Sequence, residues 1–136
     1  MRLYKMERTK FWIDNGILFC EICNPDETLS LEVATVEAYI KGISSLCKGI
    51  KMPFLIDFRD SRGDYMNSAA KLLASSSELK KLRLSEAFVV NSLNMKLLVS
   101  SYKRIYEPTT PFEIFKVFDE ALAYSIKAKE KLKGSI

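Results

Sequence analysis

The sequence predicts a single α/β domain built on a mixed β-sheet. Short apolar segments alternate with longer segments of helical periodicity, which is the order of strands and helices in a largely parallel sheet. A hairpin signal precedes them, so the sheet is expected to begin with antiparallel strands. The 136 residues, of which 48% are hydrophobic, suffice for one domain with its own core. The expected order is ββαβαβαβα over residues 1–136, with five strands, about four helices and a core at about residues 10–130.

The first two strands are predicted at Phe11–Ile13 and Ile17–Cys23, on either side of the turn Asp14–Gly16. Asn-Gly in this turn adopts the positive φ angles that a tight hairpin requires. This pair of strands gives the sheet its antiparallel start.

Cys20 and Cys23 match the C-x-x-C pattern but lie within a predicted strand. Side chains three positions apart on a strand point to opposite faces, and the Cα atoms are separated by roughly 10 Å, which is beyond disulfide reach. Cys47 is the third cysteine, and the chain has no fourth cysteine and no histidine to complete a zinc site. We therefore expect buried structural cysteines and no bound metal.

The first helix is predicted from Ser30 to Lys48, with Ser30 as its N-cap and Gly49 as the residue that ends it. Apolar residues recur along it at steps of three and four positions, as in a helix that packs one face on a sheet. The stripe consists of Val33, Val36, Ile40, Ile43, Cys47 and Ile50.

The third strand is predicted at Pro53–Phe58 and is followed by the polar loop Arg59–Tyr65. A helix is expected from about Asn67 to Leu82. Ser75–Ser77 lies in its middle, and because serine is a weak helix former, a kink or break is expected there.

The second half of the chain repeats this alternation of strand and helix. A strand at Glu86–Asn91 precedes a helix at Leu93–Tyr106, and a last strand at Phe112–Phe118 precedes a helix from Asp119 to about Lys131. Two prolines bar regular structure in the loop Glu107–Pro111. The side chains expected to face inward from the helix before this loop are Leu97, Leu98, Tyr102 and Ile105.

The composition excludes most catalytic chemistry. The chain has no histidine, which removes the commonest general base, every Ser–His or Cys–His pair and most catalytic zinc sites. We therefore expect a protein that is not an enzyme and needs no cofactor.

The net charge of +4 is mild and the basic residues are dispersed, so no nucleic-acid partner is expected. Lys80–Arg83 and Lys103–Arg104 lie at helix ends, and we expect both groups to be solvated surface. The charged residues 127–136 are expected to form a solvated, fraying helix end. The first ten residues lack the apolar segment of a signal peptide, and no apolar run approaches the roughly 20 residues of a membrane span. We expect a cytoplasmic protein.

The candidate site is the loop after Asp57, because α/β sheets bind ligands at the carboxyl ends of their strands. Arg59 and Arg62 can hold an anionic group there, aided by the N-terminus of the helix that begins near Asn67. Asn91, at the end of the next strand, borders the same rim.

This order of elements resembles the STAS superfamily, which includes the SpoIIAA-like anti-sigma-factor antagonists of bacteria. The resemblance covers residues 10–130 and implies a SpoIIAA-like sandwich with a regulatory or protein-interaction role. It rests on the segments Phe11–Ile17, Pro53–Asp57, Ala87–Val90, Thr110–Phe115 and Asp119–Leu122.

The resemblance also directs attention to two serines. In the antagonists, a partner kinase phosphorylates the serine of an Asp-Ser-x-Gly motif at the start of the second helix. The matching segment here is Tyr65–Ser68, so the motif is absent, and Asp60–Gly63 matches it in letters but lies too close to the preceding strand. Ser61 and Ser68 are the candidate phosphoacceptors, since a helix N-terminus stabilises a phosphate group.

Three functional hypotheses follow. The first is a non-catalytic cytoplasmic regulatory module that binds a protein partner through the loop after Asp57, switched by phosphorylation; a homodimer is left open. The second is a SEC14-like domain, a class often grouped with STAS, that binds a small anionic or lipid ligand in an apolar cavity under the second and third helices. The third is a Mg²⁺-dependent, receiver-like phosphoacceptor using Asp57 and Asp60, with Asp64 nearby. The hairpin at the start of the sheet argues against the third.

Overall fold

A computed structural model describes residues 3–6, 9–22, 33–59 and 73–134 of the chain. Its strands form one sheet in which each strand lies next to the strand that follows it in the sequence. The strands are β1 (Leu3–Met6), β2 (Thr9–Asp14), β3 (Ile17–Glu21), β4 (Met52–Asp57), β5 (Arg83–Val89) and β6 (Phe112–Phe115). The helices are α1 (Val33–Cys47), α3 (Ser77–Leu82), α4 (Leu93–Tyr106) and α5 (Phe118–Gly134).

The sheet is mixed, as predicted. β1, β2 and β3 pair in antiparallel fashion, whereas β3, β4, β5 and β6 run parallel. The five expected strands are present, and β1 adds a sixth at the edge, where Leu3 pairs with Trp12. The first ten positions mix charged and apolar residues, and this mixture concealed the strand. An edge strand pairs with only one other strand, so its apolar pattern can be weaker than that of a central strand.

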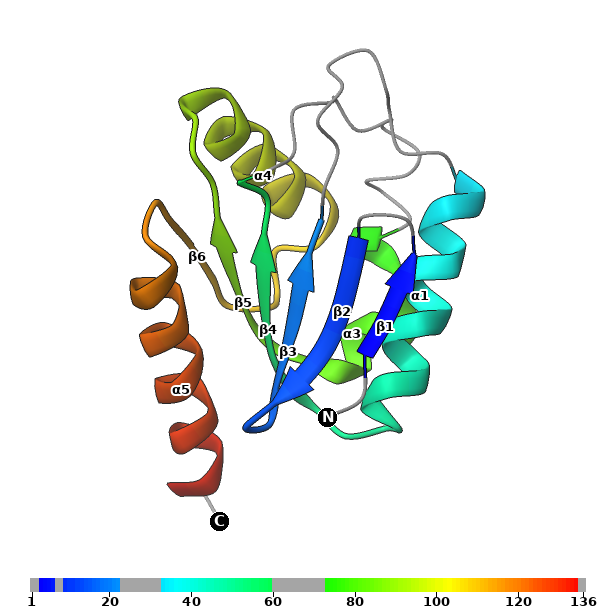
Figure 1. The fold of residues 1–136 in the computed structure, drawn as a ribbon. Helices are drawn as coiled ribbons and strands as arrows, with labels where there is room; N and C mark the ends of the chain where they lie inside the picture. Colours follow the sequence, from blue (N-terminus) through cyan, green and yellow to red (C-terminus); the bar gives the residue numbers. More distant parts are fainter. Residues whose placement is uncertain (1–2, 7–8, 23–32, 60–72, 135–136) are drawn as a thin grey trace.

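Three of the described helices cover one face of the sheet and one covers the other (Figure 1). Each connection through α1, α3 and α4 moves one strand further in the same direction, and because such crossovers are right-handed, these three helices share one face. Helix α5 follows the last strand and packs on the other face, mainly against β4 and β5. The central strand β4 is buried along its whole length because both of its faces are covered.

Alternation along the strands divides the core into two layers. Phe54, Ile56 and Phe88 face α1, α3 and α4 in the larger layer. Leu55 and Val89 face α5 in the smaller layer.

The predicted turns are confirmed by their backbone angles. Asn15 and Gly16 have φ angles of 52° and 73°, as a two-residue hairpin turn requires. Lys48 and Gly49 have φ angles of 51° and 79° and end α1 at the expected place. Residues 73–75 are helical and the chain leaves the helix at Ser76, whose hydroxyl caps α3, so the break predicted within Ser75–Ser77 is also confirmed.

The prediction for the inner face of α4 was wrong for two residues. Leu97 and Ile105 are 56% and 67% exposed, whereas Met95, Val99 and Lys103 face the core. Leu98 and Tyr102 pack against the core at its margin, as expected. The helix is rotated relative to the prediction because Lys103 enters the interior and contacts buried carboxylates. A prediction from the spacing of apolar residues cannot detect this contact.

Several smaller details also differ from prediction. β5 begins at Arg83 rather than Glu86, and β6 ends at Phe115, so that Phe118 opens α5 instead of closing a strand. Ile50 is 64% exposed because it follows the turn at Gly49 and no longer belongs to the helical stripe. Helix α5 continues to Gly134, beyond the expected end at Lys131.

Replacement of Gly49 by alanine tests the turn that ends α1. A Cβ at this position meets no atom within 4 Å, but the φ angle of 79° disfavours any L side chain. Gly49→Ala is therefore expected to lower the free energy of unfolding by about 1 kcal/mol through backbone strain alone. Urea denaturation measures this, with Lys48→Gly as the control, since glycine relieves the strain at φ 51°. An equal loss in both variants would contradict this account.

Candidate functional site

A cluster of four charged side chains lies inside the protein at the junction of β5 and α4. Arg83 and Glu86 come from β5, Lys103 from the last turn of α4, and Glu107 from the residue that caps this helix. None of the four is more than 5% exposed. Glu86 faces the larger core layer, paired in register between Phe54 on β4 and Phe112 on β6.

The four charges form a closed set of ion pairs. Lys103 Nζ contacts Glu86 Oε1 and lies 2.9 Å from Glu107 Oε2. Arg83 Nη1 lies 3.5 Å from Glu107 Oε2 and 3.7 Å from Glu86 Oε1, and Arg83 Nη2 donates to the carbonyl oxygen of Leu73 at 2.8 Å. Two cations meet two anions, so the cluster has no net charge.

Glu107 is the most heavily bonded member of the cluster. Its Oε1 accepts from the backbone N–H of Thr109 at 2.8 Å, from the Thr109 hydroxyl and from the backbone N–H of Thr110 at 3.0 Å. Burial by itself would raise the pKa of Glu107, but the hydrogen bonds from Thr109, Thr110 and Lys103 outweigh burial and hold its pKa well below the ordinary value. Glu107 therefore stays ionised inside the protein.

A cavity of about 120 Å³ adjoins this cluster, between the sheet and the helices α1, α3 and α4. Most of its wall is aromatic and aliphatic. The lining residues that the structure describes are Phe11, Cys20, Ile22, Tyr39, Ile43, Phe54, Ile56, Phe58, Leu73, Ala74, Leu79, Arg83, Glu86, Phe88, Val99, Tyr102 and Lys103.

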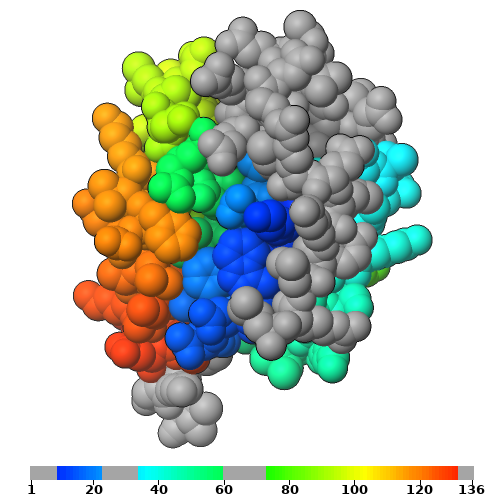
Figure 2. All heavy atoms as spheres, viewed as in Figure 1, coloured from blue at the N-terminus to red at the C-terminus, as the bar shows by residue number. Residues whose placement is uncertain are grey.

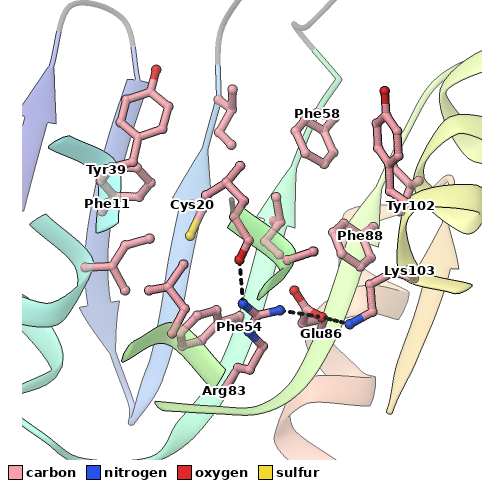
Figure 3. A pocket seen from close by; sticks show the side chains of 17 residues that line it. Phe11, Cys20, Tyr39, Phe54, Phe58, Arg83, Glu86, Phe88, Tyr102 and Lys103 are labelled. Atoms are coloured by element: carbon pink, nitrogen blue, oxygen red, sulfur yellow. Dashed lines mark hydrogen bonds and ion pairs between the residues drawn. The ribbon is translucent and has the colours of Figure 1, made fainter. Parts of the chain in front are cut away.

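The polar and apolar parts of the cavity are separated (Figure 3). Arg83, Glu86 and Lys103 gather at one end, whereas Phe58 and Tyr102 lie at the opposite end, near the carboxyl ends of the strands. Protein interiors contain few voids larger than a water molecule, so an apolar space of this size is a feature to be explained. An apolar cavity of about 150 Å³ is large enough to hold benzene, which sets the scale of a ligand for this one.

A second polar group lies at the carboxyl ends of β4 and β5. Asp57 accepts from the backbone N–H of Arg59 at 3.0 Å and from its guanidinium through Nε and Nη2, the latter at 2.7 Å. Asn91 donates its side-chain N–H to the Arg59 carbonyl oxygen at 2.7 Å. The Arg59 guanidinium also lies 5.4 Å from the ring centroid of Phe118, a cation–π contact.

A second hollow, of about 210 Å³, adjoins this group on the face covered by α5. Trp12 stacks on Phe19 with ring centroids 5.3 Å apart, and Phe19 lies 6.2 Å from Phe118. Figure 2 shows this side of the molecule, where side chains of β2 and β3 (blue) emerge beside α5 (orange to red).

The sequence-predicted loop site is therefore assembled in part. Asp57, Arg59 and Asn91 come together as expected, although both Asp57 oxygens are occupied by Arg59 rather than turned to solvent. The other candidates, Ser61, Arg62, Asn67 and Ser68, lie outside the described residues, as do Asp60 and Asp64. Within the described ranges no group of three or more His, Cys, Asp or Glu residues is placed to hold a metal ion.

Sequence reasoning missed the buried cluster. We expected Arg83 and Lys103 at the surface because each belongs to a short basic group at a helix end, and this prediction was wrong, since both are 4% exposed. One signal was present: Glu86 lies two positions before Phe88 and precedes the apolar run Ala87–Val90, and a carboxylate that faces a core requires a cationic partner.

The cysteine prediction agrees with the structure where the structure describes it. Cys20 and Cys47 are buried free thiols. Burial, with smaller contributions from Cys47 and Glu86, raises the pKa of Cys20, and burial raises the pKa of Cys47 to about 11. Neither is therefore a reactive thiolate at neutral pH. Cys23 lies outside the described residues.

The mixed sheet with an antiparallel start and helices on both faces defines a SpoIIAA-like α/β protein. The crystal structure of an uncharacterized protein of the DUF3478 family with a SpoIIAA-like fold, from Shewanella loihica PV-4, is similar, with a TM-score of 0.58. The sequences are 17% identical, and the match covers 91% of this chain and 90% of that one. The expected SpoIIAA-like fold is thereby confirmed, and at this identity the likeness concerns the fold alone.

The chain itself belongs to the DUF7793 family, a domain of unknown function, whose model matches residues 11–129. No curated protein matches the sequence. None of the helices in the described part of the chain has the length and apolar character needed to cross a membrane.

The ionised state of Glu107 predicts a specific dependence of stability on pH. Because its pKa is lowered on folding, Glu107 stabilises the protein above its unfolded pKa of about 4.5, and this contribution is lost as the pH falls towards the folded value. Glu107→Gln removes one partner of a buried ion pair and is expected to cost about 3 kcal/mol at pH 7. The difference between wild type and variant should shrink as the pH falls below 4.5.

Chemical denaturation at several pH values measures this difference. Glu37→Gln, on the exposed side of α1, is the matched control and should show little change at any pH. A difference between wild type and Glu107→Gln that is the same at pH 7 and pH 3 would contradict the lowered pKa.

Proposed function

We propose that this protein is a non-catalytic binding module that takes up a small apolar ligand between the sheet and helices α1, α3 and α4. The observation that carries the proposal is the cavity of about 120 Å³, whose wall is mostly aromatic and aliphatic. Of the functions that the sequence leaves open, a ligand-binding domain requires such a space, whereas a module that acts only through its surface does not. Location in the cytoplasm is part of the proposal.

The arrangement of the cavity supports this function. Phe11, Phe54 and Phe88 supply rigid apolar walls from three strands, and Val99 closes the side formed by α4. Small-molecule sites are mainly apolar with a few convergent polar groups, and here the charged groups lie together at one end. The cavity also touches Leu73 and Ala74, in the helical residues that precede α3.

Toluene is a suitable first probe because it is apolar and close to the cavity in size. Toluene should raise the melting temperature of the wild-type protein, since a ligand that binds only the folded state stabilises it by mass action. Val99→Phe places a ring in the cavity and should abolish this shift. Leu97→Phe, on the same helix at a position 56% exposed, should bind toluene like the wild type.

Circular dichroism establishes whether each variant is folded before its shift is interpreted. No shift by toluene in the wild type would overturn the proposal, whatever the variants do. Equal shifts in wild type and a folded Val99→Phe variant would place the binding elsewhere and would also count against it.

A regulatory module that binds a protein partner through the loop after β4 is a second candidate. The observation that favours it is the Asp57–Arg59–Asn91 group, which fixes the start of this loop at the carboxyl ends of β4 and β5. Fold likeness to a SpoIIAA-like protein agrees with this role but does not specify a partner.

Affinity capture from cells tests the second candidate. A partner retained by wild type and lost with Asp57→Asn is expected, because the substitution removes the charge that holds Arg59. Phosphosite mapping should find phosphate on Ser61 or Ser68. Capture that is unchanged by Asp57→Asn, together with no phosphate at either serine, would exclude this role.

A further inference from the structure

The hydrogen-bond donors and acceptors at the charged end of the cavity determine which chemical group of a ligand can bind there. The inference rests on the proposed binding function and concerns the chemical class of the ligand. Two cations and two carboxylates lie at this end, and all four are nearly inaccessible to solvent.

Three of the four carboxylate oxygens in the cluster are already used. Glu107 Oε1 accepts from Thr109 and Thr110, and Glu107 Oε2 accepts from Lys103 and Arg83. Glu86 Oε1 contacts both Lys103 and Arg83. At these three oxygens, a ligand that presents only a hydrogen-bond donor competes with existing ion pairs and hydrogen bonds.

Arg83 has more hydrogen-bond donors than its partners in the described part of the chain accept. The guanidinium of an arginine has five N–H donors. Nη1 of Arg83 meets two carboxylates and Nη2 donates to the Leu73 carbonyl oxygen, but Nε is buried and has no hydrogen-bond partner among the residues that the structure describes. Unsatisfied buried donors are rare in native proteins because each one loses its hydrogen bond to water without a replacement.

Charge sets a further requirement. The cluster is neutral as it stands, so a bound anion or cation would leave a net charge enclosed by apolar walls, which is strongly disfavoured. We propose that the ligand is a neutral, mainly apolar molecule with one hydrogen-bond acceptor, which binds the Arg83 guanidinium while its apolar body fills the cavity. A carbonyl, ether or nitrile group meets this description.

Four probes that share a benzene ring separate the requirement for a hydrogen-bond acceptor from the requirement for zero net charge. Toluene has no acceptor, benzonitrile has a neutral acceptor, benzoate is an anion and benzylamine is a cation at pH 7. Benzonitrile should bind about tenfold more tightly than toluene, the effect of one additional hydrogen bond. Benzoate and benzylamine should show no measurable binding at concentrations that saturate benzonitrile.

The nitrile also reports its own environment. Its infrared stretching band should move to higher wavenumber in the complex than in an apolar solvent, as expected for a nitrile that accepts a hydrogen bond. Arg83→Lys keeps the charge but removes the guanidinium donors, so benzonitrile affinity should fall to that of toluene, while toluene affinity stays unchanged. Arg104→Lys, at the adjacent exposed position of α4, is the control and should alter neither.

The outcomes distinguish this inference from the function on which it rests. If neither toluene nor benzonitrile binds, both proposals are overturned. If toluene binds and benzonitrile binds no more tightly, or benzoate binds best, the ligand class is overturned and the binding function stands. The probe series on wild-type protein decides the matter even if Arg83→Lys does not fold.

Discussion

The charge of Glu86, placed on a strand that faces the core, is the constraint on which much of this structure depends. A carboxylate between Phe54 and Phe112 must be neutralised, and Lys103 is drawn inward from α4 to do so. This contact sets the rotation of α4 and leaves Leu97 exposed to solvent. The position of a whole helix thus follows from one buried ion pair.

The buried charged cluster also contacts the segment before β6 and the helical residues before α3. Glu107 accepts hydrogen bonds from Thr109 and Thr110 before β6, and Arg83 donates to the carbonyl oxygen of Leu73 in the helical residues 73–75. Replacing buried ion pairs with apolar residues is often neutral or stabilising, so such a cluster is weak evidence for stability. Its arrangement here is better explained by specificity: it fixes α4, β5 and the start of β6 in one geometry and adjoins a cavity that apolar packing would otherwise fill.

The topology places the cavity and the loop group on different parts of the molecule. Because three successive crossovers put α1, α3 and α4 on one face, the larger core layer lies between a sheet and three separate helices of unequal length. Ala121 of the single helix α5 packs in the smaller core layer with Ala87 of β5. The mostly apolar cavity is on the three-helix face, while Arg59, the partner of Asp57, contacts Phe118 at the start of α5.

The sequence by itself determined the fold class, because hairpin chemistry at Asn15-Gly16 and the alternation of strands with helical stripes are local signals. It also located Asp57, Arg59 and Asn91 at neighbouring strand ends, since parallel strands end at the same edge of a sheet. Only the tertiary structure decided that Arg83 and Lys103 are interior residues. The basic residues near them in sequence, Lys81 and Arg104, are exposed. Arg83 and Lys103 are brought inside by their ion pairs with Glu86 and Glu107, which no local pattern of hydrophobicity encodes.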